Sequence, residues 1–168
     1  VTNDLTEAWN GTVRWSLETL DGKVLVDGEE AVFVPALDAV QVCALDFSNQ
    51  VTDANRREVV LVYALYRNDQ RLSMGVMPFA PNKHLMLKDP ELSADVKKTE
   101  AGFEITLSAE RLARFVWLEL KGKDVIFSDN TFDIPAGRSV TVTLPAQEDW
   151  RVENVRDTLR VRSLVDSF

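Results

Sequence analysis

Apolar and polar side chains alternate along most of this chain, and the alternation leaves few folds open to it. In the segment TVRWSLETL, Val13, Trp15 and Leu17 share one face of an extended chain. Arg14 and Ser16, which stand between them, take the other face. Because successive side chains of a strand point to opposite sides, this period of two predicts a half-buried strand.

Further segments with strand character follow, and Gly, Asp or Pro turn signals separate them. In the first half they are VLVDGEEAVFVPA, AVQVCALDF, EVVLVYALYR and RLSMGVMPF. In the second half they are ELSADVKKT, GFEITLSA, RFVWLELKG, DVIFSDNTF, SVTVTLPA and TLRVRSLVD. Only AERLAR and DWRVENVRD look locally helical, and each is too short to form more than a turn or a loop. Strands at intervals of about 8–12 residues with turns between them are typical of antiparallel sandwiches.

The alternation stops once, near the middle of the chain, where three prolines fall within PFAPNKHLMLKDP. We therefore predict an all-β chain of two tandem immunoglobulin-like antiparallel β-sandwich modules, at residues 1–82 and 83–168. Each module would have about 80 residues, which is within the usual size of a domain. A hydrophobic content of 45% is sufficient for a core.

Charge and composition exclude several classes of function. The formal net charge is −8, and both halves of the chain are acidic, which argues against nucleic acid or an anionic membrane as a partner. No apolar run is long enough to predict a transmembrane helix, no signal peptide is visible, and a single cysteine, Cys43, allows no intrachain disulfide. The chain begins at VTNDL without a Met, so we expect a segment of a longer protein, cytoplasmic or periplasmic/secreted.

Two aspartates four residues apart, Asp129 and Asp133, are the most suggestive acidic pair. Two carboxylates carry out glycoside hydrolysis when they lie at a suitable separation, which the sequence does not give. The favoured interpretation is structural: Asp129 and Asn130 would bond to backbone N–H groups and hold a turn. Phe127 and Phe132 on either side would anchor that turn to a core.

Other catalytic or metal-binding arrangements have little support. The one histidine, His84, and the one cysteine, Cys43, are far apart in the sequence, and no local signature links either to a nucleophile. His and Cys ligands are too few for a metal site. The seven glycines are scattered and form no phosphate loop, so no cofactor is predicted.

Tryptophan side chains are the remaining candidates for ligand binding, because exposed indole rings form platforms for sugars. Trp15 lies on the apolar face of its strand, and Trp117 lies in a strand that is apolar on both faces, so both are assigned to packing. Trp9 and Trp150 are placed in loops and are the predicted carbohydrate contacts. The competing interpretation, which we favour, is that these two rings seal interfaces between modules.

The segment FSDNTFDIPAG resembles a signature near the C-terminus of β-mannosidases of the β-galactosidase-like glycoside hydrolase family. VTNDL, PNKHLMLKDPEL, LARFVWLEL and LRVRSLVDSF also resemble the family, in the same order, so the resemblance covers nearly the whole chain. The residues taken as a structural family motif are Phe127, Ser128, Asp129, Asn130, Phe132, Asp133 and Gly137.

The resemblance implies a non-catalytic C-terminal accessory region. In this family the two catalytic glutamates lie on a (β/α)₈ barrel upstream of these modules. This chain is too short to form such a barrel, so no catalytic residue is assigned to it. The chain itself is expected to be inactive and to brace the barrel of its parent chain, with dimer contacts or a wall of the substrate approach as further roles. The parent would hydrolyse terminal non-reducing β-D-mannose residues with retention.

Three alternatives stay open. The same region occurs in exo-β-D-glucosaminidases, and the sugar specificity would be set in the barrel. One module would otherwise be a carbohydrate-binding module that uses Trp9 or Trp150. The last alternative is a stand-alone adhesion or scaffolding protein.

Overall fold

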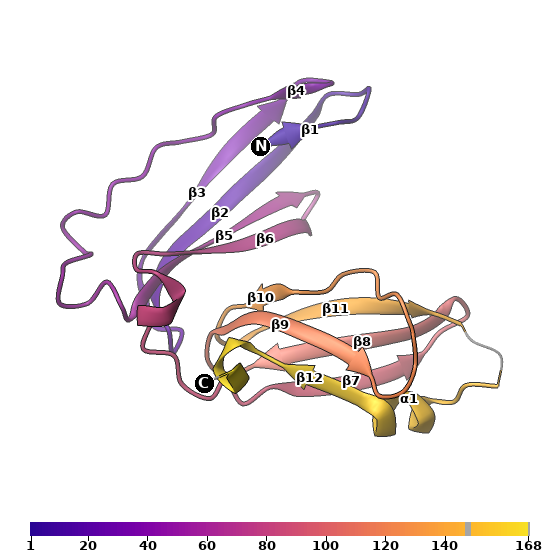
Figure 1. Cartoon of the computed structure of the whole chain (residues 1–168). Coiled ribbons are helices and arrows are strands. Elements are labelled where there is room, and N and C mark those ends of the chain that lie inside the picture. The colour runs from indigo at the N-terminus through magenta and orange to yellow at the C-terminus, as the bar shows by residue number, and fades with distance from the viewer. Residues whose placement is uncertain (147–148, 168) are drawn as a thin grey trace. The chain divides into compact units, whose positions relative to one another are not determined.

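A computed structural model gives the structure of the protein and describes residues 1–146 and 149–167. Strands dominate these residues, and all of their strand pairs are antiparallel (Figure 1). The chain divides into two compact units, Val1–Thr19 with Lys23–Met86, and Leu20–Gly22 with Leu87–Phe168. The prediction of an all-β fold is confirmed.

The first unit extends slightly beyond the module boundary that the sequence suggested at residues 82 and 83. The 3₁₀ helix η1, Asn82–His84, is bound to this unit because Arg57 Nε donates to the His84 carbonyl at 2.5 Å. The Met86 N–H donates to the Arg57 carbonyl at 3.0 Å. We therefore propose that the first module ends at Met86.

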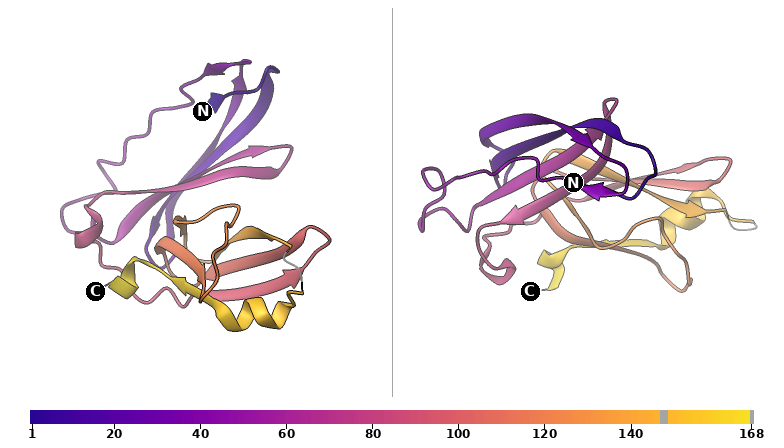
Figure 2. Two further views of the ribbon diagram at one scale, coloured as in Figure 1. Left: turned by 45° about the vertical axis from the view of Figure 1, so that its right-hand side comes forward. Right: turned by 90° about the horizontal axis from the view of Figure 1, so that it is seen from above.

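The first unit is built on one four-stranded sheet in the order β3-β2-β5-β6. Figure 2 shows this sheet from two further directions. A two-stranded sheet joins β1 to β4. The strands are β1 (Thr2–Asn3), β2 (Trp9–Thr19), β3 (Val24–Val34), β4 (Asp38–Ala39), β5 (Val59–Arg67) and β6 (Gln70–Pro78).

The prediction of a strand at AVQVCALDF is wrong, although the segment does pack against the sheet as a strand of a sandwich would. Only its start belongs to β4, and residues 40–47 form neither strand nor helix. Val40 and Val42 still pack against one core cluster of the four-stranded sheet, and Phe47 belongs to the next. The alternation therefore marked an extended segment that covers a sheet without a backbone ladder of its own.

Gly28 lies inside β3, although the Asp27-Gly28 pair is of a kind that is typical of hairpin turns. It pairs with Trp15 across the sheet. A Cβ placed at Gly28 would lie 2.5 Å from Trp15 Cζ2. Glycine is therefore required here because the indole ring of Trp15 covers the backbone.

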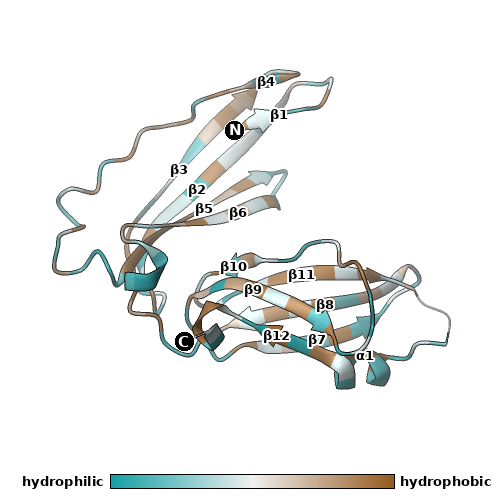
Figure 3. Cartoon of the chain, viewed as in Figure 1, coloured by the Kyte–Doolittle hydropathy of each residue, from teal (hydrophilic) through white to brown (hydrophobic). Residues whose placement is uncertain are grey.

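The second unit places two three-stranded sheets around one core, in the orders β10-β9-β12 and β11-β8-β7. Brown and teal segments alternate along its strands in Figure 3, which is the period-two pattern of the sequence. Both sheets supply fully buried side chains, among them Ile105 of β8, Val116 of β9 and Val142 of β11. The strands are β7 (Ser93–Lys98), β8 (Gly102–Ala109), β9 (Ala113–Leu120), β10 (Phe132–Ile134), β11 (Arg138–Pro145) and β12 (Leu159–Arg162).

Two local predictions in this unit need correction. DVIFSDNTF is not a strand, since the ladder of β10 begins only at Phe132. DWRVENVRD is more than a turn, because it forms helix α1, Val152–Thr158. Val152 and the fully buried Val155 pack on the core, and this tertiary contact stabilises a helix too short to persist alone. A second 3₁₀ helix, η2, spans Leu164–Ser167.

Candidate functional site

The segment FSDNTFDIPAG contains β10 and the turn before it, and it bonds to both sheets of the second unit. On one side, the Ser128 N–H donates to the Thr143 carbonyl of β11 at 2.9 Å. The Thr143 N–H donates in return to Ser128 Oγ at 2.8 Å. On the other side, residues of the same segment bond to β9, which belongs to the opposite sheet. The segment therefore ties the two layers of the sandwich together.

Asn130 makes the bonds to β9 with its side chain. Its Oδ1 accepts from the Leu118 N–H at 2.9 Å, and its Nδ2 donates to the Leu118 carbonyl at 2.9 Å. One amide side chain thus satisfies both backbone groups of Leu118, as a neighbouring strand would. The same Oδ1 accepts from the N–H of Thr131, whose φ of 66° lies in the left-handed region.

The flanking residues fix the ends of this segment. Phe127 and Phe132 are half-buried and pack against the core cluster of the unit. The Asp129 Oδ1 accepts from the Asn130 N–H at 2.7 Å. The Gly137 N–H donates to the Ala109 carbonyl at 2.8 Å, and its φ of 68° favours glycine.

Asp133 forms an ion pair with Arg114 in the interior of the unit. Asp133 Oδ2 lies 2.6 Å from Arg114 Nη1, and the two side chains are 17% and 6% exposed. Asp133 Oδ1 accepts from the Phe115 N–H at 3.0 Å. Burial raises the pKa of the Asp133 carboxyl, while the Phe115 N–H and the Arg114 charge act in the opposite direction.

Both carboxylates of the acidic pair are thus engaged with the chain itself. Asp129 bonds to the turn, and Asp133 bonds to a buried guanidinium and to the backbone of β9. A carboxylate that acts as an acid, base or nucleophile needs access to a substrate. The geometry of Asp129 and Asp133 supports a structural role instead.

Trp9 does not lie in a loop, in contrast to the sequence-based prediction. It begins β2 and is only 7% exposed. It belongs to a core cluster with Val32 and Val34, and the guanidinium of Arg67 lies 5.6 Å from its ring centre. In this structure the ring is part of the first unit's core and presents no open face to a sugar.

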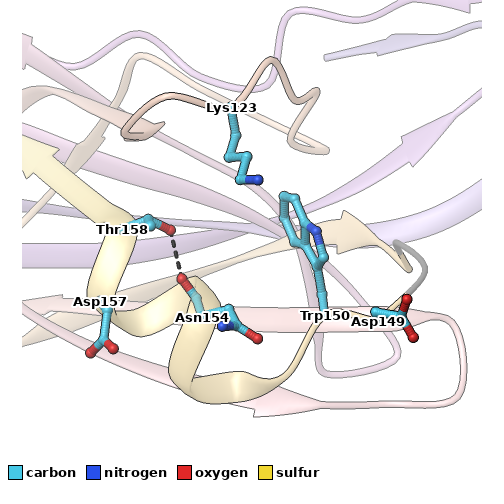
Figure 4. Close-up of a pocket in the computed structure, with 6 residues that line it drawn as sticks. All are labelled: Lys123, Asp149, Trp150, Asn154, Asp157 and Thr158. Atoms are coloured by element: carbon cyan, nitrogen blue, oxygen red, sulfur yellow. Dashed lines mark hydrogen bonds between the residues drawn. The ribbon is translucent and has the colours of Figure 1, made fainter.

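Trp150, the other predicted sugar contact, lines a pocket of about 400 Å³ in the second unit (Figure 4). Trp150 is half-buried and packs on the core. Figure 4 shows Lys123 reaching toward its ring, with the ammonium 5.6 Å from the ring centre. Three neighbours of Trp150 come from α1, and Asp149 comes from just before it. The lining residues are Lys123, Asp149, Trp150, Asn154, Asp157 and Thr158.

Sequence reasoning found only Trp150 of this pocket. Asn154 and Asp157 lie three residues apart in α1. If DWRVENVRD had been assigned to a helix from the sequence, these two side chains would have been predicted to be neighbours. Lys123 lies in the connection after β9. No pattern in the sequence links this lysine to Trp150, because only the folded sandwich brings them together.

The other candidates, His84 and Cys43, do not line this pocket. His84 is exposed in η1, and Cys43 is a half-buried free thiol in the segment that covers the first sheet. Within residues 1–146 and 149–167, no three His, Cys, Asp or Glu side chains gather where they could hold a metal ion. No helix among these residues is long and apolar enough to cross a membrane.

The fold, two antiparallel β modules in tandem, defines a class of multi-domain β-sandwich proteins, and family models identify the class more closely. Residues 1–84 match the model of the mannosidase Ig/CBM-like domain, and residues 87–167 match that of an Ig-fold domain of mannosidases. The chain therefore consists of two immunoglobulin-like domains of the mannosidase family. The resemblance stated from the sequence, and the prediction of two immunoglobulin-like modules, are confirmed.

Solved structures contain the same fold over nearly the whole chain. The β-D-mannosidase from Dictyoglomus thermophilum matches with a TM-score of 0.83 and 22% identity over 97% of this chain. The exo-chitosanase from Amycolatopsis orientalis matches with a TM-score of 0.60 and 16% identity over 96% of this chain. This chain spans only 19% and 24% of those two proteins. The comparison with curated proteins finds no match.

Proposed function

We propose that this chain is the non-catalytic accessory region of a β-mannosidase-type exoglycosidase, and that it braces the catalytic barrel. The observation that carries the proposal is the tandem order of two mannosidase-type modules, together with the likeness to a part of a β-D-mannosidase over 97% of this chain. Since the chain spans 19% of that protein, the chemistry would belong to other parts of a longer chain.

The engaged carboxylates support a bracing role over a catalytic one. The motif FSDNTFDIPAG uses its polar side chains to join β9 to β11 rather than to line an open cleft. A rigid sandwich held by such bonds is suited to support a larger domain. The parent would remove terminal non-reducing β-D-mannose residues with retention of configuration.

The proposal is tested with an aryl β-D-mannopyranoside as substrate. We expect hydrolysis by a natural full-length protein that contains these residues, and none by the 168-residue chain alone. Hydrolysis by the chain alone, at a rate above that of heat-treated protein, would contradict the accessory role. A full-length protein inactive toward the mannoside would contradict the assigned specificity.

An exo-β-D-glucosaminidase parent is the second candidate, and the likeness to the exo-chitosanase favours it. Its lower TM-score, 0.60 against 0.83, ranks it behind the mannosidase. An aryl β-D-glucosaminide assayed in parallel separates the two candidates, because preference for one sugar over the other is a ratio of kcat/KM values.

A further inference from the structure

We infer that the pocket beside α1 is a binding site for a neutral saccharide, with Trp150 as its platform. This inference goes beyond the proposed function, because it concerns binding by the second module itself and requires no catalytic barrel. The pocket is named here by its lining residues, Lys123, Asp149, Trp150, Asn154, Asp157 and Thr158. A volume of about 400 Å³ lies within the range of about 300–1,000 Å³ that is usual for ligand pockets.

Trp150 supplies the apolar surface of the site. Its indole is half-buried, so packing on the core holds the ring in place while part of it faces the pocket. A fixed aromatic face contributes contact area at little cost in side-chain entropy. The C–H face of a sugar ring is the kind of surface that such a flat, pre-ordered ring accommodates.

Donors and acceptors surround this ring. The Asn154 Oδ1 accepts from the Arg151 N–H at 3.0 Å, which orients the amide and leaves Nδ2 to donate. The Thr158 hydroxyl donates to the Asn154 carbonyl at 2.7 Å, so its oxygen is left to accept. The Lys123 ammonium adds a charged donor beside the ring. Sugar hydroxyls both donate and accept, and this mixture suits them.

Two carboxylates complete the lining and restrict the ligand class. In the part of the chain that the structure describes, no ion pair engages Asp149 or Asp157. Two carboxylates beside one ammonium give the lining a net negative charge, which disfavours an anionic ligand. The ammonium of Lys123 lies 5.6 Å from the centre of the Trp150 ring, so it would repel a cationic group stacked on that ring. The charged lining also disfavours a purely apolar molecule. A neutral polyhydroxylated ring is the class that remains.

The test is calorimetric titration of the 168-residue chain with β-1,4-linked mannotetraose and, separately, with cellotetraose. We expect a dissociation constant on the order of 1 mM for at least one of them, as for a shallow site with few hydrogen bonds. Trp150→Ala should abolish binding, and Asp157→Ala, at an exposed position, should weaken it at least about tenfold. Trp117→Ala is the matched control, since Trp117 is 39% exposed on β9 and lies outside the pocket.

Each outcome decides the inference. Binding that Trp117→Ala retains and that Trp150→Ala and Asp157→Ala lose would support it. No heat with either tetraose up to its solubility limit, or binding unaffected by Asp157→Ala, would overturn it. Tighter binding of a glucosamine tetramer than of both neutral sugars would overturn the neutral class. Since Trp150 packs on the core, Trp150→Ala could prevent the second unit from folding. In that case Asp157→Ala alone decides the test, because Asp157 is exposed and its removal leaves the core intact. Failure here leaves the hydrolysis assay of the parent unaffected.

Discussion

Asn130 takes the place of a strand at the edge of β9, where its amide pairs with both backbone groups of Leu118. We predict that Asn130→Ala lowers the free energy of unfolding of the second unit by about 1–3 kcal/mol, because it leaves part-buried backbone groups without partners. Urea denaturation followed by circular dichroism measures the change.

Asp129→Ala is the matched control for this prediction. It removes one exposed bond, from the Asn130 N–H to Asp129 Oδ1, so it should cost only about 0.5–1 kcal/mol. Equal losses in the two variants would show that the turn as a whole, and not the pairing with Leu118, stabilises the unit.

Asp133 makes the stability of the second unit depend on pH. Burial raises the pKa of its carboxyl in the folded state, so the folded state holds this proton more tightly than the unfolded state does. The stability that Asp133 contributes is therefore complete below the unfolded pKa, about 3.9, and is lost as the pH rises through the folded pKa. Asp133→Asn keeps an acceptor for the Phe115 N–H and does not titrate.

We therefore predict that wild type loses stability relative to Asp133→Asn as the pH rises from about 3 to about 7. The size of the change reports how far the pKa of Asp133 differs between the folded and unfolded states, at about 1.4 kcal/mol per unit. Urea denaturation at several pH values measures it, with Asp129→Asn as a control for removing a charge from the same segment. A trend of opposite sign would mean that Arg114, 2.6 Å away, outweighs burial.

At the level of single residues, the sequence predicted that a side chain would hold a turn, but it did not predict to which distant residue that side chain would bond. Turn-forming side chains at Asp129 and Asn130 follow from local chemistry, because Asx side chains bond to nearby N–H groups. The partner of Asn130, Leu118, is 12 residues away in the chain, and local rules do not reach that far. Burial of Trp9 was missed for the same reason, since its cluster partners Val32 and Val34 come from β3.

At the level of elements, the contact between β2 and β3 at Trp15 and Gly28 is a test of sheet packing. In a strand, replacing glycine by alanine usually stabilises a protein by about 0.5–1 kcal/mol. Here we predict a loss of about 1–3 kcal/mol for Gly28→Ala, because the new Cβ would meet the indole ring at 2.5 Å. Thermal and urea unfolding measure the effect.

A double-mutant cycle with Trp15→Leu identifies the cause. In the Trp15→Leu background the ring is gone, so Gly28→Ala should cost little or become stabilising. The two changes would then couple by more than about 1 kcal/mol. Additive effects would mean that Gly28 is required for its own backbone conformation and not for the approach of Trp15.

Which elements the sequence could predict depended on whether their pattern is local. The strands β8 and β11 follow directly from alternation, because each has one face on the core. Residues 40–47 alternate as well, but a ladder needs a neighbouring backbone that alternation does not reveal. Helix α1 was underestimated because its stability comes from the burial of Val155 rather than from its length.

For the whole molecule, the pattern alone indicated two modules, and the family motif indicated their origin. The units have separate hydrophobic clusters, so each contains the core that a domain needs to fold. What the pattern could not supply is the pocket beside α1, which joins residues from a helix and a distant connection.

Separate cores predict two separate unfolding transitions in scanning calorimetry of the intact chain. Val34 of the first unit and Ile105 of the second are both fully buried. We expect Val34→Ala and Ile105→Val each to cost about 1 kcal/mol or more and to lower a different transition by about 4–8 °C. A single transition that both variants lower would mean that the two units unfold as one cooperative body. In that case the free energy of unfolding of each module would depend on its contact with the other module, and neither module would unfold as an independent domain.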